Sequence, residues 1–505
     1  MKKFVAFALT LILVLTMLSG CNQPAPKVEE PAKVAKDTIT LVTDVEPDTL
    51  DPRRGNSVAN NIPMRLIHDS LMFMGDDNVF QPRLATKWEF IDDTHIRFTL
   101  REGVKFSNGD PFTSADVLYS LARTKLDSTS LSTMKWYDEV NSKAEGPLSV
   151  VLAMNYPYAP ALQVLCGGRT WIGSQKVMEA MGEEAYARNP VGLGRYMLDK
   201  WTTGASMELK RNTNFWGEPA KTEKLVFKYS GEATARVIAM ETGEVDFAYY
   251  INGSDIKRVN EIPGYHVERG PSAKYYTIVL NMQNPKFADE RVRYALSYAI
   301  DLEALVDAGF DGTANVMSSI IPSTVEGWKD TYGKWEYNPE KAKALLAEAG
   351  ATDLSFELHI LPTAEFQKLA EIVQSFWAKV GVTVNIEQSA LAAREAQGPW
   401  EASIRNGNAT EITGILIIYD SLFASRVGNN DDKLDEMLMQ LQVTYDKAER
   451  EKQIHALQDY IYKIRFTIPF AETDTIYGVG DHIEGYEFTY QISNCNIPEW
   501  VAYKK

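Results

Sequence analysis

The 505-residue sequence lacks the motifs that mark most catalytic and metal centres. It contains no Gly-x-Ser-x-Gly elbow, no His-Glu-x-x-His and no Walker A sequence, and residues 192–194 lack the third glycine of a dinucleotide-binding loop. Histidine is scarce, and no two of the six lie at the spacing of zinc ligands: His68, His95, His266, His359, His455 and His482. In so long a chain, these absences predict a protein that is not an enzyme and that has no metal site.

Cysteine is also rare, with Cys21, Cys166 and Cys495 as the three in the chain. Three are too few for the disulfide framework of a small secreted domain. Cys166 and Cys495 could form one bridge or remain two buried thiols, and the sequence leaves both possibilities open. After the first 20 residues no stretch of 18 or more apolar residues occurs, so we predict no transmembrane helix.

The first 20 residues have the pattern of an export signal. Lys2 and Lys3 give a positive start, residues 4–18 form an apolar run too short for a membrane span, and small residues precede Cys21. The Leu-Ser-Gly-Cys junction resembles the lipobox of bacterial lipoproteins, which implies cleavage before Cys21 and acylation of this cysteine. The alternative is an ordinary secretory signal with a chance cysteine. We therefore expect a protein outside the cytoplasm, at the cell surface or in the periplasm, anchored to the membrane by lipid on Cys21.

Residues 21–36 contain three prolines among alanine, lysine and glutamate, without apolar periodicity, and this composition predicts a semi-extended tether. Removal of residues 1–20 leaves 50 basic against 68 acidic residues, a formal charge of −18. Such an acidic balance argues against nucleic acid or an anionic lipid surface as a partner. The membrane is therefore expected to be contacted through the lipid anchor alone.

Strand and helix patterns interleave along the rest of the chain. Alternating residues predict strands over 38–43 and 95–100, and further strands are expected over 382–386 and 467–470. Helices are predicted from their caps and apolar spacing, over residues 113–121, 289–300, 338–350, 364–379 and 446–464. This interleaving predicts α/β lobes rather than a β-sandwich or a helix bundle.

Several segments resemble blocks of the bacterial solute-binding proteins of family 5, which feed peptide, opine and nickel ABC importers. The longest is residues 88–117, with the sequence WEFIDDTHIRFTLREGVKFSNGDPFTSADV. Residues 190–196 and 209–217 (PVGLGRY and LKRNTNFWG) are similar to a second block, in which Arg195 replaces the usual proline. A third block comprises Leu280-Asn281 and residues 289–301. The resemblance covers the chain from residue 38 to the C-terminus.

This resemblance implies an α/β, two-lobed periplasmic-binding-protein-like fold with an extra subdomain in lobe I and two crossover strands, the class II type. The crossovers are expected near residues 275–281 and 469–477. The units expected are a signal peptide (1–20), a lipidated tether (21–36), lobe I (37–277) with an inserted subdomain at about 72–187, lobe II (278–470) and a return to lobe I (471–505).

The implied role is to capture a small solute, a short peptide or amino-acid-like molecule, in an interlobe cleft and to deliver it to an ABC permease and ATPase complex. We expect a monomer that needs no cofactor. A metal-chelate receptor of the same family, of the nickel type, is an alternative. An exported hydrolase or a sensory lipoprotein that has borrowed the fold is an alternative of another class.

The resemblance also points to residues that line the cleft in relatives. Arg169 has a planar fork suited to a carboxylate. Residues 407–411 match a stretch where amine-binding relatives carry Gly-Trp-x-x-Asp, which would place Glu411 opposite an ammonium group. The full set expected to contact ligand is Arg169, Trp171, Trp136, Glu411, Asn408, Arg53, Asn61 and Tyr419. Two plainer interpretations stay open: Arg169 as a surface arginine beside a core tryptophan, and Glu411 as a solvated loop acid.

Overall fold

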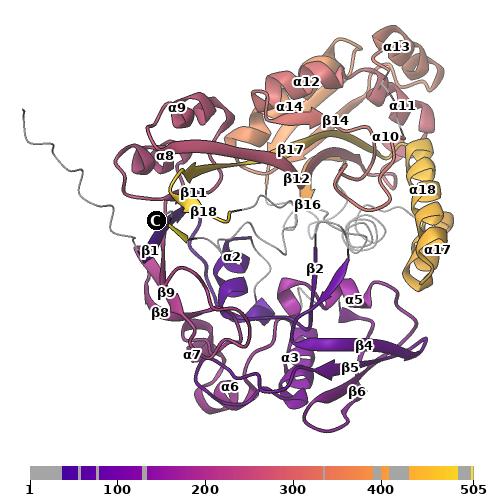
Figure 1. Ribbon diagram of the computed structural model, residues 1–505. Coiled ribbons are helices and arrows are strands. Elements are labelled where there is room, and N and C mark those ends of the chain that lie inside the picture. Colours follow the sequence, from indigo (N-terminus) through magenta and orange to yellow (C-terminus); the bar gives the residue numbers. More distant parts are fainter. Residues whose placement is uncertain are drawn as a thin grey trace, which may run out of the picture.

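The computed structural model describes residues 37–54, 58–75, 79–127, 134–331, 333, 336–389, 400–408, 431–486 and 502–503. These residues form two α/β lobes joined by two long strands, and a further subdomain lies at the far end of lobe I (Figure 1). In Figure 1, lobe II lies at the upper right and is formed by the second half of the chain. Lobe I and its subdomain are formed mainly by the indigo and magenta segments of the first half. The fold has the predicted α/β class.

Among the described residues, one sheet of 11 strands passes through both lobes, in the order β15-β14-β16-β12-β17-β11-β1-β10-β9-β8, with β13 paired to β17 beside this path. Its strands are β1 (Thr38–Thr43), β8 (Tyr196–Thr202), β9 (Ser206–Arg211), β10 (Lys224–Tyr229), β11 (Phe247–Ala248), β12 (Tyr265–Leu280), β13 (Ala314–Val316), β14 (Ser355–Ile360), β15 (Thr383–Gln388), β16 (Ala402–Asn408) and β17 (Thr467–Gly480).

The lobe I part of the sheet is built around β1, as predicted for residues 38–43. β1 pairs in parallel with β10 on one side and with β11 on the other. Ile39, Leu41 and Phe247 are fully buried in its core. The other elements of this lobe are η1 (Pro52–Arg54), α2 (Val58–Ile67), α8 (Ala233–Glu241), η3 (Gly253–Asp255), α9 (Ile256–Asn260) and β18 (Ile483–Glu484), which pairs with β19 (Ala502–Tyr503).

The two crossovers are the antiparallel strands β12 and β17. Residues 275–280 of β12 pair with β16 in lobe II, whereas residues 478–479 of β17 pair with β11 in lobe I, so each strand belongs to both lobes. The expected crossovers at 275–281 and 469–477 fall within or overlap these strands, which are longer because pairing continues into both lobes. The register shifts between Pro271 and Tyr275, where proline cannot donate to the ladder.

The subdomain of lobe I has its own core and a four-stranded antiparallel sheet in the order β4-β5-β7-β6. Phe98 and Leu100 are buried there, as the alternation over residues 95–100 predicts, and Phe106 is buried beside them. The predicted start of the helix at residue 113 is confirmed, since Thr113 and Asp116 form a capping box at the start of α3. The subdomain contains β2 (Met72–Met74), β3 (Phe80–Pro82), β4 (Ala85–Asp92), β5 (His95–Leu100), α3 (Ser114–Leu126), β6 (Tyr137–Ala144), β7 (Ser149–Met154), α5 (Ala161–Val164), η2 (Gly168–Thr170), α6 (Gln175–Met181) and α7 (Glu183–Arg188).

Lobe II places helices on both faces of its strands. The predicted N-caps at Asp289, Asn338 and Asp446 all accept backbone hydrogen bonds from the first turns of their helices. These helices are α10 (Pro285–Ala288), α11 (Glu290–Tyr298), α12 (Leu302–Phe310), α13 (Pro339–Glu348), α14 (Ala364–Ala378), α17 (Asp432–Val443) and α18 (Lys447–Ile464).

The two glycines of the 190–196 block have a structural explanation. Gly194 donates its backbone N–H to the Ile67 carbonyl at 2.8 Å, at the end of α2. A Cβ on Gly194 would lie 2.2 Å from the Leu66 carbonyl oxygen, and one on Gly192 would lie 2.0 Å from that of Ile67. Both positions therefore require glycine because two backbone segments touch there, and this contact fixes α2 against lobe I.

Candidate functional site

Three short elements of lobe I, η1, α2 and η2, meet at the predicted ligand-binding region. Asn61 lies on α2 and Arg169 on η2, with Trp171 directly after η2. A Cβ built on Gly168 would lie 3.0 Å from Asn61 Oδ1 and 3.3 Å from the Trp171 ring, so these residues are in close contact. The structure thus brings together Asn61, Arg169 and Trp171. Trp171 itself is buried in the lobe I core.

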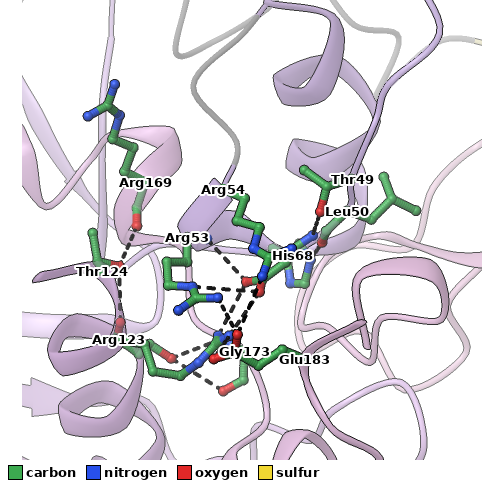
Figure 2. A network of polar contacts seen from close by, with 12 residues as sticks. Thr49, Leu50, Arg53, Arg54, His68, Arg123, Thr124, Arg169, Gly173 and Glu183 are labelled. Atoms are coloured by element: carbon green, nitrogen blue, oxygen red, sulfur yellow. Dashed lines mark hydrogen bonds and ion pairs between the residues drawn. The ribbon is translucent and has the colours of Figure 1, made fainter. Parts of the chain in front are cut away.

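Arg169 is half-buried, and α3 holds its backbone in place because Thr124 Oγ1 donates to the Arg169 carbonyl at 2.8 Å. Its side chain points away from the ion pairs below it (Figure 2). Burial lowers the pKa of Arg169, and the charge of Asp127 offsets this in part. An anion near the guanidinium would therefore be stabilised more than it would be at a solvated arginine.

Arg53 belongs to a network of ion pairs under this region (Figure 2). Arg53 Nη2 donates to Glu183 Oε2 at 2.5 Å. The centre of the network is the pair Asp51–Arg123, in which two nitrogens of Arg123 donate to the two carboxylate oxygens at 3.2 and 2.8 Å. Asp51 is fully buried and Arg123 is 8% exposed. The observed partners give Arg53 a structural contact that ties η1 to α7, and sequence patterns give no signal for the pair Asp51–Arg123.

Trp136 is almost fully buried in the subdomain core and stacks on Tyr158, with ring centroids 5.8 Å apart and an interplanar angle of 8°. Its Nε1 is buried and has no hydrogen-bond partner in the described part of the chain. Asn61 Oδ1 is likewise buried and has no hydrogen-bond partner among the described residues. A buried donor and a buried acceptor without partners are costly, so each would gain from a group supplied by a ligand.

On the lobe II side of the predicted site, the structure describes Asn408 but not Glu411 or Tyr419. Asn408 is the exposed last residue of β16 and pairs with Lys274 of β12. In Figure 1, β16 ends toward the half of the molecule that contains α2 and α5. Glu411 and Tyr419 lie outside the described residues, as do Cys21 and Cys495. Cys166 is buried, with its thiol 3.3 Å from the Leu162 carbonyl, and the choice between a bridge to Cys495 and two separate thiols depends on residues outside the described ranges.

One group in the described ranges could offer ligands to a cation: Glu357 and His359 on β14 and Glu387 on β15. The register places His359 beside Glu387, which no sequence spacing reveals. His359 Nε2 lies 3.5 Å from Glu357 and its Nδ1 lies 4.0 Å from Glu387. The two carboxylates thus lie nearest to opposite nitrogens of the His359 ring.

Buried His68, beside the ion pairs in Figure 2, makes stability dependent on pH. Burial lowers its pKa from 6.5 to about 4 although Nε2 contacts the Leu50 carbonyl at 3.0 Å. Between these values the unfolded chain binds a proton that the folded chain does not, so stability is complete above pH 6.5 and falls toward pH 4. We expect a loss of about 2 kcal/mol between pH 7 and pH 5 from this group. Urea denaturation at pH 7 and pH 5 measures this loss of unfolding free energy. His68→Gln should lose less between the two pH values than the wild type does, and an equal loss would contradict the role of His68.

The sequence model of one protein family, described as "Bacterial extracellular solute-binding proteins, family 5 Middle", matches residues 79–419 of this chain. The glutathione-binding protein GsiB of Escherichia coli K12 is 26% identical over 481 residues, covering 90% of this chain and 92% of the relative. DppA from Helicobacter pylori, solved with the peptide STSA, superposes with a TM-score of 0.80 at 22% identity, over 93% of this chain and 99% of DppA. CtaP from Listeria monocytogenes gives 0.82 at 18% identity, over 94% and 100%.

The chain belongs to family 5 of the bacterial extracellular solute-binding proteins. The predicted family and the two-lobed fold are confirmed. It is an extracytoplasmic solute-binding component of an ABC importer and not an enzyme. Across the described residues, no helix is both long and apolar enough to span a bilayer.

Proposed function

We propose that this protein captures a short peptide or a peptide-like amino-acid derivative between its lobes, with a carboxylate of the solute on Arg169 and an amine on Glu411. The partial burial of the Arg169 side chain beside α2 is the observation that carries the proposal. A half-buried guanidinium whose pKa is lowered by burial gains from a counter-charge, and a carboxylate matches its planar fork.

Two buried polar atoms of lobe I support a peptide rather than a simple acid. Asn61 Oδ1 would accept an N–H and Trp136 Nε1 would donate to a carbonyl, and a peptide unit supplies one of each. GsiB is named for glutathione and DppA was solved with a tetrapeptide, so two similar proteins handle ligands of this chemistry. The solute would lie where η2 and α2 of lobe I face the end of β16.

We further propose that the protein works as a monomeric lipoprotein, with signal peptide 1–20 and tether 21–36. The lobes are proposed at 37–277, with the subdomain at about 72–187, and at 278–470, with residues 471–505 returning to lobe I. Two acyl chains or more would anchor the chain stably, whereas one gives only marginal membrane binding.

The test is to identify the small molecule that co-purifies with the protein by mass spectrometry after mild denaturation. A thermal-shift series with reduced glutathione, short peptides and a nickel–histidine complex would follow. We expect a peptide-like molecule, a ligand-dependent rise in melting temperature, and recovery of the ligand unchanged. Stabilisation by the nickel complex alone would assign the metal-chelate alternative, and cleavage of the peptide would reject a pure binding role.

A further inference from the structure

The turn between α17 and α18 of lobe II reaches across to the subdomain of lobe I. Tyr445 in this turn accepts a hydrogen bond from the Tyr158 backbone N–H at 3.1 Å and donates one to the Asp93 carbonyl at 2.9 Å. Beside it, the Ala159 N–H donates to the Gln442 carbonyl at 2.7 Å. The lower end of the α17–α18 pair lies next to the β4 end of the subdomain in Figure 1.

An aromatic contact adds to these hydrogen bonds. The Tyr445 ring meets Phe90 edge to face, with centroids 5.1 Å apart. Phe90 is still 40% exposed, on the outer part of β4. Such an edge-to-face pair stabilises the contact beyond the burial of its area. Opening of the lobes would return both rings to water.

The side of the contact that belongs to lobe I is held rigidly. Asp93 and Thr94 form the tip of the β4–β5 hairpin, since Asp92 pairs with His95. Asp92 Oδ1 accepts from the Thr94 N–H at 2.8 Å, and the Thr94 carbonyl accepts from the Met154 N–H. These bonds fix the Asp93 carbonyl in place without help from lobe II. On the other flank, the Tyr158 ring is held by its stack on Trp136.

We propose that Tyr445 is an interlobe latch, which stabilises the closed arrangement of the lobes without touching the solute. In the closed state one hydroxyl joins two backbone groups of the subdomain to lobe II, and in an open state all three groups are hydrated. The latch therefore shifts the balance between open and closed lobes, and so the affinity for any solute that needs closure. It rests on the solute-binding role of the family and not on the identity of the solute.

The Tyr445 hydroxyl can donate its hydrogen bond over the whole physiological range of pH. Burial raises the pKa of Tyr445, so the hydroxyl keeps the proton that it donates to Asp93. Loss of the two hydrogen bonds of the Tyr445 hydroxyl would shift the equilibrium between open and closed lobes roughly tenfold.

The test compares the ligand-free full chain with Tyr445→Phe, using hydrogen exchange resolved to single amides and small-angle scattering. The diagnostic amide is Ala159, because its acceptor is the Gln442 carbonyl, which the substitution leaves in place. We expect its exchange to become roughly tenfold faster and the radius of gyration to increase. The Ile96 and Leu152 amides of the subdomain sheet should keep their protection, which shows that the subdomain is still folded.

Tyr460→Phe is the matched control, since Tyr460 on α18 donates its hydroxyl to Asp431 within lobe II. It should leave the Ala159 amide unchanged. Phe90→Ala removes the ring on the lobe I side and should act in the same direction as Tyr445→Phe, so a poorly folding tyrosine variant does not prevent the test. Unchanged exchange at Ala159 in either folded variant, or an equal change in Tyr460→Phe, overturns the latch. No ligand is added, so these outcomes do not depend on whether the solute is a peptide.

Discussion

Arg169→Ala is expected to weaken binding of the co-purified solute or of reduced glutathione by at least about 30-fold, because removing one partner of a desolvated charge pair costs 2–5 kcal/mol. The half-buried guanidinium is the group that would face the carboxylate, and alanine leaves that carboxylate without its partner. Isothermal titration calorimetry on the wild type and the variant measures the change. Arg188→Ala, which alters an arginine over the Trp201 ring elsewhere on lobe I, is the control and should bind as the wild type does.

The same titration with an amidated ligand makes the assignment specific. If Arg169 holds the C-terminal carboxylate, amidation weakens binding to the wild type and has little further effect on Arg169→Ala, because the two changes remove one interaction. Glu411→Gln should weaken binding of a ligand with a free amine in the corresponding way. Equal losses from amidation in the wild type and in Arg169→Ala would place the carboxylate elsewhere.

Asp51→Ala is expected to destabilise lobe I by about 3–5 kcal/mol, which is the usual cost of breaking a buried ion pair by removing one partner. Asp51 is fully buried, and without it Arg123 would keep its charge in the interior beside the half-exposed Glu183 at 3.4 Å. Urea denaturation at pH 7 measures the loss of unfolding free energy.

The matched control is Arg258→Ala, which breaks a pair of the same bidentate geometry on the surface. Arg258 donates to both oxygens of Glu241 at 2.7 and 2.8 Å, and both side chains are more than a third exposed. Water screens this pair, so its loss should leave the denaturation midpoint unchanged. Equal destabilisation by the two substitutions would mean that burial does not set the strength of the Asp51–Arg123 pair.

Elements with local signals could be predicted from the sequence. Strand β5 follows from the alternation of Ile96, Phe98 and Leu100, and the starts of α13 and α18 follow from Asn338 and Asp446. In each case the side chain that caps or packs lies within a few residues of the backbone that it fixes. The full length of β17 could not be predicted, because its last residues are held by β11 and β12 and not by a local pattern.

The site depends on contacts between residues far apart in the chain, and local patterns contain little information on these. Asp51 and Arg123 are 72 residues apart, and Tyr445 and Asp93 are 352 apart. Family resemblance did lead to Arg169 and Asn61, which the structure places in one region. It also led to Trp136, Trp171 and Arg53, where burial and ion pairs show a structural contribution. Glu411 and Tyr419 remain predictions.

Small-angle scattering during a ligand titration tests most directly whether the two lobes close on a small solute. We predict that the co-purified molecule, or reduced glutathione if it is the ligand found, lowers the radius of gyration until one molecule is bound per chain. The molecule recovered at the end should have its original mass. Saturable binding that leaves the radius of gyration of an initially open protein unchanged, or chemical conversion of the ligand, would contradict this function.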